Sequence, residues 1–225
     1  MFKSILVASG IALASFGAAA VESNQIDGLY NTGAGLASGK IDTHYSFEAI
    51  SGTAVGTNGH GVTTRQTGLN SMFYAWLDNT AESKWLTPSA NARESYDPIS
   101  AGVYKWSISF DLSGMDITSA WLTGRWAADN GGYIKLNGAV VATGSSFASW
   151  TNFSIDDGFL AGINTLDFIV VNTAQKVGNA TGVRVEFLDS YAVAAAVTPV
   201  PEPESWALIL SGLAVVGAIA RRRMS

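Results

Sequence analysis

Residues 104–112 read Tyr-Lys-Trp-Ser-Ile-Ser-Phe-Asp-Leu, an unbroken alternation of apolar and polar side chains. Successive side chains of a β-strand point to opposite faces, so this pattern predicts a strand with one face in a hydrophobic core. Comparable short runs rich in apolar, β-branched and aromatic residues follow at 120–126, 133–136, 139–142, 150–155, 166–172 and 183–188. Asn137-Gly138, between two of these runs, is the pair favoured in a two-residue hairpin turn. No segment before Trp206 has a helical period of adequate length, so the sequence predicts an all-β fold, a single β-sandwich over residues 21–191.

The composition excludes several kinds of chemistry. Of the 225 residues, 48% are hydrophobic and only 14% are charged; the formal net charge is −5 and there is no cysteine. Roughly 175 residues between the two ends are enough for one domain that is held together by packing without disulfides. The lack of cysteine excludes cysteine nucleophiles and cysteine-ligated zinc. The acidic balance, with no basic patch, excludes nucleic acid as a partner.

Residues 1–20 have the three parts of a secretory signal peptide. Lys3 supplies a positive start, an apolar run extends to Leu13, and the small residues Ala18 and Ala20 occupy the positions expected before a cleavage site. The pattern predicts export through the Sec translocon and cleavage by signal peptidase after Ala20. The alternative is a buried N-terminal helix, which would leave the Ala-x-Ala boundary without a reason.

The C-terminal end also has three successive parts. Residues 192–199 form a linker of small residues that leads to Pro201, Glu202 and Pro203. Proline fixes φ and removes a backbone donor, so this segment is predicted to be neither helix nor central strand. Residues 206–220 are apolar apart from Ser211, and they are followed by Arg221, Arg222 and Arg223.

The apolar run predicts a marginal membrane helix over residues 206–220. Such a helix is about 22 Å long, short of the roughly 30 Å hydrocarbon core of a bilayer. Trp206 can lie at one interface, while the side-chain stems of Arg221, Arg222 and Arg223 reach the other. Because arginine clusters stay in the cytoplasm, the predicted sandwich lies outside the inner membrane. The signal peptide requires the same orientation.

This tail, residues 200–223, resembles the PEP-CTERM sorting signal, in which a Pro-Glu-Pro motif precedes a short membrane helix and a basic cluster. The resemblance implies processing by an exosortase, a membrane-embedded transpeptidase-like enzyme, in a Gram-negative bacterium that makes extracellular polysaccharide. It also implies a route, with an inner-membrane intermediate and a final location at the cell surface or in the extracellular matrix. A C-terminal anchor that is never cleaved is the alternative.

Several strings between the two ends resemble the jelly-roll domains of other PEP-CTERM proteins, which are similar to galactose-binding-like sandwiches. They are residues 28–33, 42–45, 122–130, 136–138, 162–172 and 181–186. The resemblance implies a jelly-roll or galactose-binding-like β-sandwich for the exported domain. These are turn and core motifs, so they specify the fold better than the ligand.

Few residues qualify for catalysis. His44 and His60 are the only histidines, and the Gly-x-Ser-x-Gly nucleophile elbow is absent. A glycan-active enzyme, the alternative function, needs convergent carboxylates or an activated nucleophile, and the sequence offers neither in recognisable form. We therefore predict a non-catalytic protein without cofactor or metal. The flexible, oxygen-rich Asp129-Asn130-Gly131-Gly132 leaves a calcium loop open as the alternative to a tight turn.

Exposed aromatic faces are the remaining candidates for ligand binding, because they stack on the apolar faces of pyranose rings. The candidates are Trp121, Trp126, Tyr133 and Trp150. Trp121 and Trp126 differ in strand parity, so at most one of them belongs to the core of a regular strand. Trp126, with Asp129 and Asn130 as hydrogen-bonding neighbours, forms the candidate contact with an extracellular polysaccharide. Core packing is the alternative for any single aromatic residue.

Overall fold

The computed structural model describes residues 23–54, 59–63, 76–196 and 203–223. They belong to two units, a domain that ends at Ala194 and a C-terminal unit that begins at Ala195. The predicted signal peptide, with Ala18 and Ala20, lies outside the described residues, as do Pro201 and Glu202 of the sorting motif. Those predictions therefore stay predictions.

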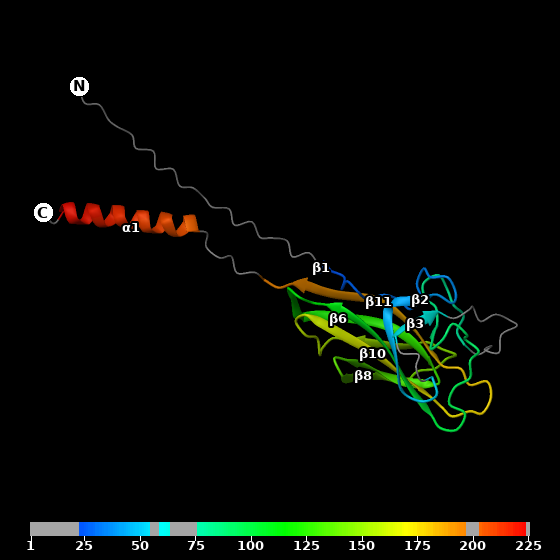
Figure 1. Ribbon diagram of the computed structural model, residues 1–225. Coiled ribbons are helices and arrows are strands. Elements are labelled where there is room, and N and C mark those ends of the chain that lie inside the picture. Colours follow the sequence, from blue (N-terminus) through cyan, green and yellow to red (C-terminus); the bar gives the residue numbers. More distant parts are fainter. Residues whose placement is uncertain (1–22, 55–58, 64–75, 197–202, 224–225) are drawn as a thin grey trace. The chain divides into compact units, whose positions relative to one another are not determined.

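The described part of the domain consists of strands and loops (Figure 1). The strands are β1 (Ser23–Asn24), β2 (Ile41–Ser51), β3 (Gly59–Thr63), β4 (Leu86–Thr87), β5 (Gly102–Asp111), β6 (Met115–Asp129), β7 (Gly131–Leu136), β8 (Ala139–Thr143), β9 (Thr151–Ile155), β10 (Ile163–Asn172) and β11 (Gly182–Ala194). Neighbouring strands pair in the order β8-β7-β10-β5-β2-β3-β4-β11-β6-β9, all antiparallel, and β1 pairs with β11. This path folds over into two layers, so the predicted β-sandwich is confirmed.

The core between the layers follows the alternation in the sequence. On β5, Tyr104, Trp106, Ile108 and Phe110 are buried, while the intervening side chains are partly or fully exposed. The two layers meet through aromatic contacts, such as the one between Trp126 of β6 and Phe168 of β10, whose ring centroids are 6.1 Å apart. Period-2 patterning thus predicted correctly which face of β5 is inside.

The predicted hairpin at Asn137-Gly138 is also confirmed. It joins β7 to β8, with Leu136 opposite Ala139. Asn137 has φ 51° and Gly138 has φ 86°. A type I′ turn needs positive φ at both central residues, and asparagine and glycine are the residues that adopt it most readily.

The longest pairing joins β6 to β11, and the N-terminal segment runs along the other edge of β11. Thr32 donates its backbone N–H to the Val185 carbonyl at 3.1 Å, and its hydroxyl accepts the Val185 N–H at 3.0 Å. Further along, the Ser190 hydroxyl accepts the Ile26 N–H, and β1 places Ser23 opposite Val193. Together with the pairing of Val183 with Leu86 of β4, these bonds satisfy backbone groups along this edge of β11, so that less of the edge is open to further strands.

The C-terminal unit contains helix α1 (Pro203–Arg223). It covers the predicted helix over 206–220, but it starts at the last proline of the motif and includes the arginines. Among the described residues, no helix is long and apolar enough to span a membrane. The predicted membrane span over 206–220 is therefore corrected; its fifteen residues measure only about 22 Å as a helix. Upstream, β11 extends to Ala194, so the first residues of the segment predicted as a linker belong to a strand.

Gly124 of β6 leaves room for its neighbouring strands β9 and β11 in the same layer, which gives a first prediction. A Cβ at this position would overlap the Phe153 ring and lie 2.8 Å from the Glu186 carbonyl oxygen. Gly124→Ala should therefore lower the free energy of unfolding by about 1–3 kcal/mol, the usual effect of overpacking.

Gly131 is the matched control, because a Cβ there meets no atom within 4 Å. Gly131→Ala should change stability by less than about 1 kcal/mol. Urea denaturation monitored by tryptophan fluorescence compares the two variants. Equal stabilities would contradict the close packing at Gly124.

Candidate functional site

The C-terminal candidate is the segment that begins with Pro203. Pro203 is the first residue of α1, where proline is tolerated because the first N–H groups of a helix have no partner inside it. All described side chains of α1, from Trp206 to Arg222, are exposed. A helix that is apolar on every side is typical of a segment that another apolar surface covers. Arg221 and Arg222 follow directly after the apolar run, as the sequence predicted for a basic end.

Trp126 is not available to a ligand. Its side chain is 0% exposed and packs between the layers near Phe168. The prediction that Trp126 contacts a sugar is therefore wrong, and the alternative of core packing is the correct one. Parity explains the result: Trp126 and Trp121 lie on opposite faces of β6, and the structure places Trp126 on the inner face.

The side chains of Asp129 and Asn130 accept hydrogen bonds from other residues of the protein. Trp76 donates its Nε1–H to Asp129 Oδ2 at 2.8 Å, and burial raises the pKa of the Asp129 carboxyl to about 6. Asn130 Oδ1 accepts the backbone N–H and the hydroxyl of Thr173 at 2.7 and 2.6 Å. Both side chains hold loops at one end of the sandwich, and they do not form an exposed site with Trp126.

The outer face of the β6–β11 pair carries a buried ionic network that the sequence did not predict. Glu186 and Arg184 of β11 are 4% and 2% exposed. Arg125 of β6 donates through Nε and Nη2 to Glu186 Oε2, at 2.7 and 2.6 Å. Arg184 Nη2 lies 3.3 Å from Glu186 Oε1. One carboxylate is thus shared by two guanidinium groups, which is how buried charge is tolerated.

The loop over residues 78–83 covers this network and is held by it. Arg184 donates through Nε to the Ser83 hydroxyl at 2.6 Å, through Nη2 to Thr80 Oγ1 at 3.1 Å, and through Nη1 to the Asp78 carbonyl. The Ser83 hydroxyl in turn donates to Glu186 Oε1 at 2.6 Å. Burial lowers the pKa of the Arg184 guanidinium, although Glu186 opposes this effect. The network therefore attaches a long loop to the sheet.

Trp150 packs on the same network. Its ring centroid lies 4.6 Å from Arg125 Cζ and 4.7 Å from Arg184 Cζ, within the range of cation–π interaction. It is also partly buried against the cluster formed by Trp76, Trp85, Ala127 and Ala180. This predicted sugar candidate therefore has a packing role on the outer face.

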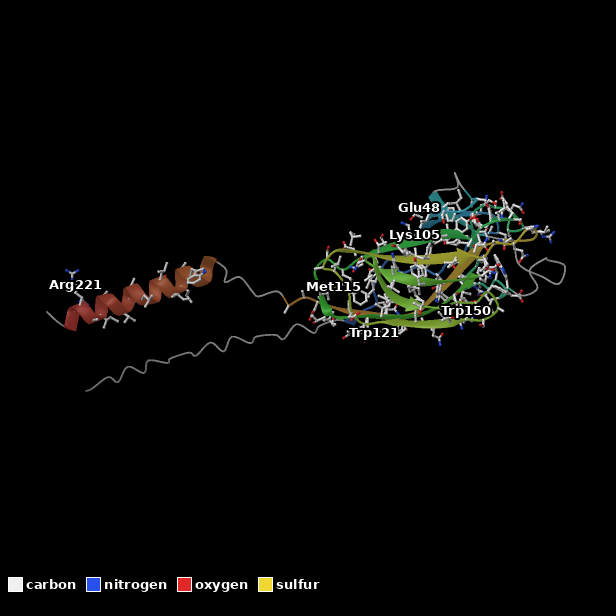
Figure 2. All side chains as sticks on the ribbon, turned by 90° about the horizontal axis from the view of Figure 1, so that it is seen from below. Glu48, Lys105, Met115, Trp121, Trp150 and Arg221 are labelled. Carbon is white, nitrogen blue, oxygen red and sulfur yellow. The ribbon has the colours of Figure 1, made fainter. Side chains whose placement is uncertain are left out.

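Trp121 lies toward the other end of the same outer face. In Figure 2, Trp121 and Trp150 lie on one side of the sandwich, and Glu48 and Lys105 lie on the other. Trp121 is opposite Tyr191 of β11, and the two rings are nearly parallel, with centroids 6.0 Å apart and planes at 10°. Both side chains are partly exposed. Of the tryptophans predicted as sugar candidates, Trp121 has an aromatic partner on an accessible sheet face.

His44 is held by Asp42. The Asp42 carboxylate is buried, accepts the Gly33 N–H at 2.7 Å, and lies 3.0 Å from His44 Nδ1. The His44 ring stacks on Tyr30 with centroids 3.8 Å apart. The side chain of His60 lies outside the described residues. In the part of the chain that the structure describes, no three acidic or histidine side chains gather where they could hold a metal ion.

The comparisons with known proteins identify the C-terminal unit first. Residues 199–223 match the PEP-CTERM protein-sorting motif. The chain therefore carries this sorting motif at its C-terminus, as the order Pro-Glu-Pro, apolar helix and arginine cluster predicted. A search of curated proteins finds no match.

Three solved structures are similar to this chain at low sequence identity. A family 35 carbohydrate-binding module from an environmental isolate shares 12% identity, with 68% of this chain and 98% of that chain covered and a TM-score of 0.28. The module Xyl-CBM35, in complex with a glucuronic acid-containing disaccharide, shares 14% identity, with 72% and 100% covered and a TM-score of 0.30. A PA14 sugar-binding domain from an RTX adhesin shares 13% identity, with 68% and 95% covered and a TM-score of 0.27.

The ionic network gives a second prediction. Glu186→Gln removes the negative charge that two buried or half-buried arginines share, so the free energy of unfolding should fall by about 3–5 kcal/mol. Glu48→Gln is the matched control, because Glu48 forms an exposed pair with Lys105 at 2.6 Å. That variant should lose no more than about 1 kcal/mol. Chemical denaturation at neutral pH distinguishes the two; similar losses would mean that Glu186 is not the centre of the network.

The raised pKa of Asp129 gives a third prediction. Its folded-state pKa is about 6, whereas an unfolded aspartate titrates near pH 3.9, so the folded domain holds the proton more tightly. This contribution to stability is complete below about pH 4 and is lost as the pH rises through about 6, by up to about 3 kcal/mol. Asp129→Asn keeps an oxygen for Trp76 but cannot ionise. Urea denaturation from pH 4 to 7 should show a smaller decrease for the variant; parallel curves would contradict the assignment.

Proposed function

We propose that this chain is an exported, non-catalytic surface or matrix protein that is sorted through its C-terminal tail and processed by an exosortase. The observation that carries the proposal is the match of residues 199–223 to the PEP-CTERM protein-sorting motif. A sorting enzyme can read Pro201, Glu202 and Pro203 together with the apolar helix that follows. In this proposal the signal peptide, residues 1–20, brings the chain to the Sec translocon and is removed by signal peptidase.

The described acidic groups support a structural role in preference to catalysis. Asp42, Asp129 and Glu186 are buried, and each accepts hydrogen bonds that hold a loop or a neighbouring strand. Glycoside hydrolysis would need two carboxyl groups on either side of a substrate cleft. These carboxylates instead accept hydrogen bonds from other residues of the protein. This favours a binding or structural role for the domain over hydrolysis of a substrate.

The final location in this proposal is the cell surface or the extracellular matrix of a Gram-negative bacterium, and the partner there is extracellular polysaccharide. The partly exposed, parallel pair of Trp121 and Tyr191 favours such a ligand, because aromatic rings pack against the apolar faces of sugars. A surface protein that keeps its whole tail is the second candidate. The state of the C-terminus distinguishes the two.

Mass spectrometry of the mature protein provides the fourth prediction. In the producing strain, the protein should lack Arg221, Arg222 and Arg223, and in a strain without the exosortase gene it should keep them. Replacing Pro201 and Glu202 by alanine should have the same effect as removing the enzyme, because the motif that is recognised is lost.

Thr198→Ala is the matched control, since it changes a nearby residue just outside the matched segment 199–223. This variant should be processed normally. An intact C-terminus in the unmodified producing strain would defeat the proposal and favour the uncleaved protein.

A further inference from the structure

The described residues cover the outer face of the β6–β11 pair at one end. At the end near Ala127, the loop residues Trp76 and Trp85 pack with Phe147 and Trp150 over the sheet. Toward the other end, Trp121 and Tyr191 are opposite each other on adjacent strands and remain partly exposed. Because the two large aromatic side chains are adjacent and partly exposed, they form a contiguous apolar surface on which a partner can bind.

The rings of the pair are stacked. Their planes are within 10° of parallel and their centroids are 6.0 Å apart. The ring surfaces that the pair does not cover are partly exposed and available to a ligand. The strands of the sheet hold both rings, so little side-chain freedom is lost on binding.

Polar side chains surround the pair. Thr123 and Trp121 are on the same face of β6, and the partners of Thr123 on the neighbouring strands are Asp189 and Ser154, both exposed. They offer two hydroxyl groups and one carboxylate next to the rings. Hydroxyl and carboxylate groups around an aromatic surface match the hydroxyl-rich edge and apolar face of a sugar ring. The carboxylate of Asp189 disfavours an anionic sugar at this point.

The size of the surface argues against a protein partner. A fully buried aromatic side chain contributes about 150–250 Å², and Trp121 and Tyr191 are already partly buried. A specific protein–protein interface needs about 800 Å² on each partner. A patch of two rings is too small for such an interface, but it is sufficient for a few pyranose rings.

From these observations we propose that Trp121 and Tyr191 form a binding platform for a neutral pyranose chain, with Thr123, Ser154 and Asp189 as its hydrogen-bonding border. This inference rests on the proposed function, since it assigns a site and a ligand class to a surface protein in a polysaccharide matrix. It replaces the site predicted around Trp126.

The fifth prediction tests the platform with the mature protein purified from the producing strain. Cellohexaose and chitohexaose are titrated while tryptophan fluorescence is measured, and polygalacturonate serves as an acidic probe. Trp121→Ala and Tyr191→Ala should each weaken binding of a neutral probe about tenfold, and Trp121→Phe should weaken it less, because part of the ring surface is kept.

Tyr133→Ala is the matched control, because Tyr133 is a partly exposed aromatic residue of β7, which lies in the other layer. It should bind like the parent protein. Thermal unfolding checks that all variants are folded; should Trp121→Ala fail to fold, the comparison of Tyr191→Ala with Tyr133→Ala decides.

Each other outcome overturns the platform in a distinct way. Equal binding by the parent and both alanine variants would place the sugar site elsewhere and leave polysaccharide binding intact. Binding of polygalacturonate alone, or of no probe, would reject the neutral ligand. A dimer that Trp121→Ala dissociates would show that the rings meet a second copy. The mass of the mature C-terminus reports on sorting independently of all these results.

Discussion

The antiparallel pairing of β6 with β11 is the constraint on which the rest of the structure depends. Its inner face contributes Leu122, Trp126 and Val185 to the core, and its outer face holds the Arg125–Glu186 ion pair. The free edge of β11 is occupied by the N-terminal segment, and its last residue leads into the sorting tail. A change in the register of this pair by one residue would exchange the two faces and place the charges in the core.

The buried charges of the outer face explain why this sandwich has a loop layer on one side. Arg184 and Glu186 could point into water if β11 had a bare outer face. Instead, the Asp78 carbonyl and the Thr80 and Ser83 hydroxyls take the place of water around Arg184. Removing these charges from water is costly, and the bonds compensate only when the loop is in place. The network therefore favours one loop position over others more than it adds stability.

The sequence predicted the strands and the tail better than the surface. Alternation identified the inner face of β5, because burial of the large side chains of Tyr104 and Trp106 is favourable. Asn137-Gly138 identified the hairpin, because these two residues readily adopt the positive φ angles of its turn. Alternation does not reveal whether a loop distant in sequence covers the second face, which is why the burial of Arg184 was missed. Parity separated Trp121 from Trp126 but did not indicate which one faces inward; the core position of Trp126 depends on the register with β11 and β9.

The positions of the chain ends make the domain independent of both processing events. β1 begins at Ser23, just after the predicted cleavage at Ala20, and pairs with Val193 and Ala192 near the end of β11. The last residue of β11, Ala194, pairs with Met115. The strand pairing of the described domain ends at Ala194, so cleavage beyond this residue would remove none of the described strands. A sorting enzyme can then act on the tail of a folded domain, and the fold places no constraint on the tail sequence.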